Sequence, residues 1–330
     1  MTEEIKTSEN NFADSITKIT RDNIVPLSNI PKKNGRQKLS DVVRIVIMIV
    51  CLSVFVFCIY TIVQNLLDYA EAQNYYDKLA QIWGNDDAYS LNSGGDLAYS
   101  QKDYSSLGEN KIYSADSTND NSQTTVIPVP ADSDEMTRIK AKLGALYRQN
   151  SDLIAWISIP DTVIDYPVVK TDNNDYYLNH SFNGDYLLAG TIFADYRNSK
   201  NLPDNYNTVI YGHNLNLSSG TMFSILSNYF KKSYLEEHPD IYIYTTSGIY
   251  IYRIFNVAKV KATSGYIRTY FASGDDFVEF ANSMASKSVH KDETLEFTEN
   301  DRLLTLSTCT NEHFASERYC IQARLIEIRQ

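Results

Sequence analysis

The chain has 330 residues, a formal net charge of −11 and a hydrophobic share of 43%. This length suits one folded domain with extensions, and the acidic balance argues against nucleic acid as a partner, because nucleic-acid binders present a basic face. The four cysteines include no CxxC pair and no Cys/His cluster with metal-ligand spacing, so the sequence predicts neither a disulfide scaffold nor a metal site.

The first predicted element is a membrane-spanning helix. Residues 45–63 read IVIMIVCLSVFVFCIYTIV, which lacks charge, Pro and Gly and is long enough to cross a bilayer. Lysines and arginines precede this run and acidic residues follow it, and the positive flank of such a helix stays in the cytoplasm. We therefore expect a cytoplasmic tail at 1–41, a signal anchor at 42–64 in the cell membrane, and an extracellular C-terminal part. A cleaved signal peptide is the alternative, although no A-x-A cleavage site follows the run.

Residues 65–135 are predicted to form an extracellular helix followed by a flexible spacer. Residues 66–83 can extend the membrane helix. Residues 84–135 are rich in Asp, Asn, Ser and Gly and contain few aliphatic clusters. That composition is typical of a solvated linker, which would carry a domain away from the lipid surface.

A folded domain is predicted over residues 136–330. Helical periodicity begins at Met136, with Asp132 and Glu135 as a capping pair, and again at Phe277, with Ser273 as the cap. A short amphipathic helix is predicted over 222–230. Runs of β-branched and aromatic residues predict strands at 154–159, 163–169, 189–194, 208–211, 241–244, 249–260, 302–308 and 319–328. This pattern favours a mainly β fold, a barrel with helices in its loops.

Cys309 ends the run 303–309, at the edge of a polar loop. Strand alternation groups Leu304 with Leu306 on one face, and Thr305 and Ser307 with the cysteine on the other. A thiol at such a strand end can meet a substrate, whereas an inert buried thiol is the alternative.

His213 and Arg318 are the other two candidates for chemistry. His213 follows the strand 208–211 after Gly212, which lets the chain turn; a locally hydrogen-bonded loop histidine is the alternative, and His313 is a rival base. Arg318 opens the last strand, in which the alternation slips at residues 325–326; this predicts a bulge or a stretch where both faces change neighbours. If the strands of Cys309 and Arg318 are antiparallel neighbours, the guanidinium can stabilise a thiolate or an oxyanion; an exposed surface arginine is the alternative. A thiol, a base and a cation at three strand ends favour nucleophilic catalysis.

These residues resemble the sortase family, and specifically its class B. Thr305-Leu306-Ser307-Thr308-Cys309 is similar to the family's TLxTC motif, Tyr211-Gly212-His213 to its histidine motif, and Arg318-Tyr319-Cys320-Ile321 to its arginine strand. The resemblance covers about residues 136–330. It implies an eight-stranded sortase-type β-barrel behind a single N-terminal transmembrane helix, with Cys309, His213 and Arg318 as catalytic residues. It also implies a peptide groove lined by Asn174, Leu178, Tyr266, Ile267 and Ser307.

The function implied by this resemblance is a cysteine transpeptidase of a Gram-positive surface that uses no metal or other cofactor. Its partners would be secreted proteins with a C-terminal sorting signal of the LPxTG or NPxTN kind, cleaved after Thr through a thioester. The acceptor would be an amine of a peptidoglycan precursor or of a pilin. One residue departs from the pattern: Asn311 stands where some class B relatives carry Asp.

Two other functions stay open on the sequence. A hydrolytic cysteine peptidase shares the first half-reaction and differs only in using water as the acceptor. A non-enzymatic adhesin would use the tyrosine-rich hairpin at 241–252 as a binding face, because Tyr suits interfaces. A disulfide between Cys309 and Cys320 is a further, disfavoured alternative that would silence the enzyme.

Overall fold

The computed structural model of the chain describes residues 35–84, 89–92, 97–99, 126–128, 134–215, 220–309 and 316–330. It divides into two compact units, Met1–Val63 and Gln64–Gln330, and each is described by itself. The predicted division into tail, anchor, spacer and domain is finer than this and stays a prediction.

Helix α2 (Gly35–Gly84) contains the segment predicted to span a membrane. Within the described chain, Asp41–Gly84 alone is long and apolar enough for this, with a mean hydropathy of 3.0 over its most apolar 18 residues, none of them buried. Leu, Ile, Val and Phe side chains of residues 42–63 stand exposed, as a lipid-facing helix requires. The helix therefore suggests a membrane anchor.

The range predicted as a flexible spacer contains three short strands that the sequence did not reveal. Strands β1 (Tyr89–Asn92), β2 (Leu97–Tyr99) and β3 (Val126–Pro128) form an antiparallel sheet in the order β2-β1-β3. The rest of residues 85–133 lies outside the described part of the chain.

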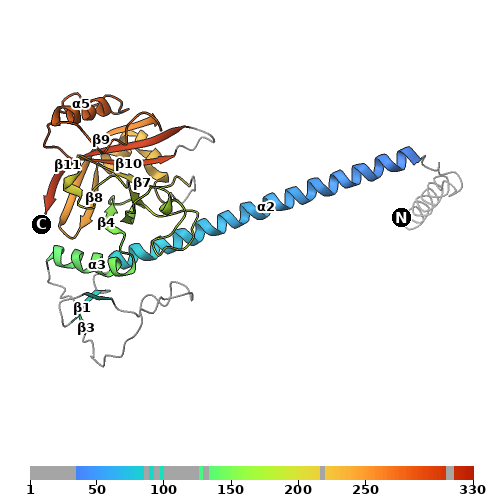
Figure 1. Cartoon of the computed structure of the whole chain (residues 1–330), viewed down its shortest axis with the longest axis horizontal. Coiled ribbons are helices and arrows are strands. Elements are labelled where there is room, and N and C mark those ends of the chain that lie inside the picture. Colours follow the sequence, from blue (N-terminus) through green and yellow to red (C-terminus); the bar gives the residue numbers. More distant parts are fainter. Residues whose placement is uncertain are drawn as a thin grey trace, which may run out of the picture. The chain divides into compact units, whose positions relative to one another are not determined.

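A closed barrel of eight strands forms the body of Gln64–Gln330, in the order β10-β11-β9-β8-β4-β5-β6-β7 (Figure 1). Only the pairs β10–β7 and β5–β6 are parallel. The predicted eight-stranded barrel with helices in its loops is confirmed. The strands are β4 (Leu153–Ser158), β5 (Asp165–Val169), β6 (Phe193–Ala194), β7 (Asn207–Tyr211), β8 (Asp240–Thr245), β9 (Gly248–Lys261), β10 (Leu303–Cys309) and β11 (Glu317–Arg329).

The connections carry the other helices of the described residues. They are α3 (Glu135–Gln149), the 3₁₀ turns η3 (Tyr176–Leu178), η4 (Leu202–Asp204) and η5 (Ser224–Phe230), α4 (Lys232–Glu237) and α5 (Gly274–Ala285). Ser273 caps α5 as predicted, by accepting from Asp276 N. Asp134 caps α3 through Thr137 N, so the cap lies two residues beyond the predicted Asp132, which is outside the described residues.

Two predicted elements differ from the structure for a backbone reason. The strand predicted at 189–194 shrinks to the two residues of β6, because Gly190 adopts φ +58° and interrupts extended structure. The helix predicted at 222–230 is the 3₁₀ turn η5, which begins only after Met222 at φ +57°.

Strands β10 and β11 separate two apolar clusters. Their inner face contributes Leu304, Leu306 and Ile321 to the barrel core, together with Tyr76 and other residues of the C-terminal part of α2. Their outer face contributes Cys320 to a second cluster under α5. The register of β11 against β9 shifts between Leu325 and Glu327, which confirms the predicted bulge, and shifts again between Gln322 and Ala323.

Candidate active site

Strand register brings the three predicted catalytic residues to one end of the barrel. Cys309, described by its backbone alone, is the direct antiparallel partner of Arg318. On the other side of β10, Ser307 pairs with Tyr211 of the parallel strand β7, and Gly212 N donates to Ser307 O at 3.2 Å. Cys309 and His213 each lie two residues beyond that pair. The cysteine position therefore pairs with Arg318 on one side, and the neighbouring strand on its other side, β7, ends two residues before His213.

The ring and the backbone of His213 are each held by a hydrogen bond. Its Nε2 lies 2.6 Å from the carbonyl oxygen of Leu178. A carbonyl only accepts, so Nε2 carries the proton and Nδ1 is the ring nitrogen left for other chemistry. Its own carbonyl accepts from Phe223 N at 3.0 Å. The rival base His313 lies outside the described residues.

Gly212 serves close packing and not the turn that the sequence suggested. The backbone there has no positive φ. A Cβ at this position would lie 2.5 Å from Ile192 Cδ1 and 2.7 Å from the ring of Phe223. The residue before the histidine must therefore be small so that these two side chains can pack against it.

Arg318 is half-buried at the start of β11. Its Nη1 donates to Glu317 O at 2.9 Å, and the Glu317 carboxylate pairs with Lys259 at 2.9 Å.

Two residues further on, Cys320 is a free thiol with no exposed surface, and burial raises its pKa well above the usual range. This thiol stays neutral, which makes it a poor nucleophile.

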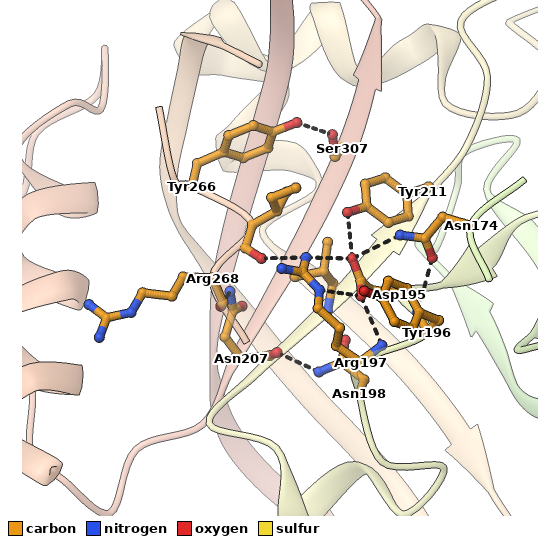
Figure 2. Close-up of polar contacts among 12 residues, drawn as sticks. Asn174, Asp195, Tyr196, Arg197, Asn198, Asn207, Tyr211, Tyr266, Arg268 and Ser307 are labelled. Carbon is orange, nitrogen blue, oxygen red and sulfur yellow. Dashed lines mark hydrogen bonds and ion pairs between the residues drawn. The ribbon is translucent and has the colours of Figure 1, made fainter. Parts of the chain in front are cut away.

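The segment Tyr266–Arg268 is fixed over the outer face of the barrel by three polar contacts. The hydroxyls of Tyr266 and Ser307 lie 2.7 Å apart (Figure 2). Arg197 Nη2 donates to Ile267 O at 3.0 Å, and Asn207 Nδ2 donates to Arg268 O at 2.8 Å. The carbonyls of Ile267 and Arg268 are thereby both held, which fixes the position of the segment Tyr266–Arg268 above β10.

Asp195 is the centre of the polar network drawn in Figure 2. Its carboxylate is fully buried and accepts from Arg197 Nε and Nη2, both at 2.7 Å, from Tyr211 Oη at 2.7 Å and from Asn174 Nδ2 at 3.2 Å. Burial by itself would raise the pKa of Asp195, but the bonds from Arg197 and Tyr211 outweigh it and hold that pKa below its usual range. Asp195 is therefore an anion that links Asn174, through Arg197, to Ile267.

A second polar row crosses four strands beneath the site. Asn256 Nδ2 donates to Gln322 Oε1 at 2.8 Å, Gln322 Nε2 to Thr305 Oγ1 at 3.0 Å, and Thr305 Oγ1 to Asn207 Oδ1 at 2.8 Å. All four side chains are fully buried. Because the row ends on Asn207, it supports the bond that holds Arg268 O.

The five predicted groove residues form three hydrogen-bonded groups around the strand ends. Leu178 accepts from His213, Tyr266 bonds Ser307, and Asn174 joins Ile267 through Asp195 and Arg197. Sequence reasoning did not assign Asp195, Arg197 and Asn207. The segment Asp195–Asn198 belongs to the part of the chain that resembles the family, but nothing in the sequence indicated that Asp195 is buried or that Arg197 bonds to Ile267.

Comparison with known proteins identifies the family behind this arrangement. The model of the sortase domain matches residues 157–326, about half of the chain. The chain belongs to the sortase family. Sortase B of Listeria monocytogenes is 35% identical over 189 residues, which cover 57% of this chain and 75% of that protein. Sortase B of Staphylococcus aureus is 33% identical over 192 residues, covering 58% and 77%.

Solved structures agree with class B. The Staphylococcus aureus sortase B–substrate complex matches with a TM-score of 0.52 at 34% identity, over 57% of this chain and 86% of that one. Sortase B of Clostridium perfringens matches with a TM-score of 0.51 at 32% identity, over 55% and 98%. The predicted family is confirmed: this sortase is a cysteine transpeptidase of class B, and the adhesin alternative falls away.

Proposed function

We propose that this sortase uses Cys309, His213 and Arg318 to cleave a C-terminal sorting signal after Thr and to transfer the protein to an amine. The observation that carries the proposal is the register of β10, which pairs Cys309 with Arg318 on β11 and Ser307 with Tyr211, the last residue of β7, two residues before His213. Nucleophilic catalysis by a thiol needs a base and a stabiliser of the oxyanion within reach, and the shared position of these three residues at one end of the barrel supports those roles for His213 and Arg318.

The first half-reaction forms a thioester. His213 Nδ1 takes the proton of the Cys309 thiol, the sulfur attacks the carbonyl carbon of the signal's Thr, and the electron pair of that carbonyl moves onto its oxygen. Arg318 stabilises this oxyanion. The carbon–nitrogen bond then breaks, and the leaving amine takes a proton from His213.

The second half-reaction consumes the amine acceptor. Its nitrogen attacks the thioester carbonyl and gives a proton back to His213, and the Cys309 thiolate leaves. The acceptor is an amine of a peptidoglycan precursor or of a pilin; water in its place makes the same enzyme a hydrolase. Because Nε2–H of His213 is engaged by Leu178 O, Nδ1 is the nitrogen that exchanges the proton.

The groove for the signal lies between η3 and the segment Tyr266–Arg268. Asn174 and Leu178 form one wall, Tyr266 and Ile267 the other, and Ser307 of β10 the floor. Support for this comes from the bonds that hold the walls at fixed height, since an extended peptide of the LPxTG or NPxTN kind needs a preformed channel. One structural neighbour is the Staphylococcus aureus sortase B–substrate complex.

The location that fits this chemistry is the outer face of the cell membrane. Basic residues at 32, 33, 36, 38 and 44 precede the apolar run, which supports a cytoplasmic N-terminus and an extracellular barrel. Secreted proteins and wall precursors meet there.

The experiment uses the full-length protein in detergent with quenched fluorescent peptides of the LPxTG and NPxTN kinds, each with and without an amine acceptor. We expect cleavage of one signal kind, ligated product when the amine is present, and loss of both with His213→Ala. Cleavage that gives only hydrolysed product with every amine tested would contradict transfer. Unchanged turnover by His213→Ala would contradict the assigned base.

A further inference from the structure

We propose that the C-terminal part of α2, through Tyr76 and Gln73, positions His213 for catalysis. This inference rests on the proposed role of His213 as acid and base. Two loops hold the histidine, one at its ring and one at its backbone, and side chains of α2 bond or pack against both. All of these residues lie within the unit Gln64–Gln330.

The ring is held through Gly190 and Thr191. Tyr76 is 1% exposed; its hydroxyl donates to Gly190 O at 2.7 Å and lies 2.9 Å from Thr191 Oγ1. Thr191 in turn donates from Oγ1 to His180 O at 2.8 Å and from its backbone N to Tyr177 O at 3.0 Å. These two acceptors lie on either side of Leu178 in the chain.

The backbone of Gly190 packs closely against the carbonyl of Leu178, which fixes the ring of His213. Its φ is +58°, and a Cβ built on it would lie 2.3 Å from Tyr177 O and 2.7 Å from Leu178 O. No side chain fits there, so backbone packs against backbone. A displacement of Gly190 therefore moves Leu178 O, which accepts the Nε2–H of His213 at 2.6 Å.

The backbone of His213 is held through residues 221–223. The Thr221 hydroxyl donates to Gln73 Oε1 of α2. The ring of Tyr76 packs edge-on against Tyr166, with centroids 5.6 Å apart, and the Tyr166 hydroxyl accepts from Met222 N at 3.1 Å.

The next residue along, Phe223, donates its backbone N–H to His213 O at 3.0 Å. Gln73 and Tyr76, three positions apart on α2, thus support both loops that hold His213. A helix packed in this way would act on catalysis through the geometry of the two loops that hold His213.

The test compares two buried tyrosines that lose the same atom. Tyr76→Phe removes the hydroxyl that bonds Gly190. Tyr229→Phe is the matched control, because Tyr229 is also fully buried and donates to a backbone carbonyl, His238 O at 3.0 Å, which belongs to neither loop. Full-length variants in detergent are assayed for kcat/KM and Tm, and the His213 Nε2–H proton is followed by NMR after histidine labelling.

We expect Tyr76→Phe to lower kcat/KM by about ten-fold and to shift or broaden the Nε2–H resonance, since small displacements of a catalytic group cost this much. Tyr229→Phe should lose a comparable amount of Tm, keep kcat/KM within about two-fold and leave the resonance in place. Equal behaviour of the two variants in turnover and in the resonance would overturn the inference.

A second pair of variants keeps the test sound if Tyr76→Phe fails to fold. Thr191→Val removes the hydroxyl between Tyr76 and His180 O, and Thr191→Ser retains it. Thr191→Val should shift the His213 resonance and lower turnover, and Thr191→Ser should restore both. If His213→Ala abolishes turnover while Thr191→Val matches native protein, the inference fails and the proposed function stands. If His213→Ala is fully active, the proposed function itself fails.

Discussion

The inner and outer faces of β10 and β11 are both buried, yet different forces hold them. Leu304, Leu306 and Ile321 on the inner face are at most 1% exposed and pack in the barrel core. Thr305 and Gln322 on the outer face are equally buried but bond to each other and onward to neighbouring strands. Apolar packing is non-directional, whereas hydrogen bonds fix angles. The inner face therefore contributes to stability through apolar packing, and the polar side chains of the outer face set the geometry of the site.

The largest effect expected from this comparison concerns the two thiols of β10 and β11. Cys309→Ala should lower peptide turnover at least about a thousand-fold with an unchanged Tm, because it removes the nucleophile at the strand end. Cys320→Ala, the control on the adjacent strand, should keep its turnover and lose only some stability, since the buried thiol is neutral. Turnover and Tm measured on both variants check this, and activity that depends on Cys320 would reverse the assignment.

An inner-face substitution should cost stability without altering the site. Leu306→Ala leaves a cavity in the barrel core and should lower the free energy of unfolding by about 2–5 kcal/mol. Below its unfolding temperature the variant should retain near-native kcat/KM per folded molecule. Denaturant melts and active-site titration separate the two quantities, and a large loss of kcat/KM at full folding would show that the two faces are not independent.

Asp195→Asn is expected to have a smaller effect on stability and to weaken peptide binding. Arg197 would lose its ionic partner but is 38% exposed, so solvent limits the cost to about 1–3 kcal/mol. KM should rise more than kcat falls, because Asn174 and Ile267 lose their link.

The stability difference between native protein and Asp195→Asn depends on pH in a definite direction. The folded-state pKa of Asp195 lies below its usual value, so the carboxylate's contribution is complete above about pH 4 and is lost as pH falls further. The stability gap between native protein and Asp195→Asn should therefore be flat from pH 5 to 8 and shrink in acid. A gap that widened in acid would contradict an ionised Asp195.

The sequence predicted the features that depend on apolar packing better than those that depend on hydrogen bonds. Alternation of apolar residues located the strands, the faces of β10 and the bulge in β11, because a period of two is local. The thiol, histidine and arginine were weak signals individually and stood out through their combination at three strand ends and through the motifs that resemble the sortase family. The support of Leu178 O by Gly190, and of Ile267 O by Arg197, joins residues far apart in sequence through backbone carbonyls. Every residue has a backbone carbonyl, so the sequence does not indicate which carbonyls are bonded or packed against. These contacts could be found only in the structure.

The most direct test of the account is the intact mass of the full-length protein mixed with a cleavable sorting-signal peptide in the absence of amine. We expect an adduct equal to the peptide fragment ending in Thr minus one water, mapped to Cys309, absent from Cys309→Ala and discharged when an amine is added. An adduct on any other residue, or one that forms in Cys309→Ala, would contradict the claim that the register of β10 places the nucleophile between His213 and Arg318.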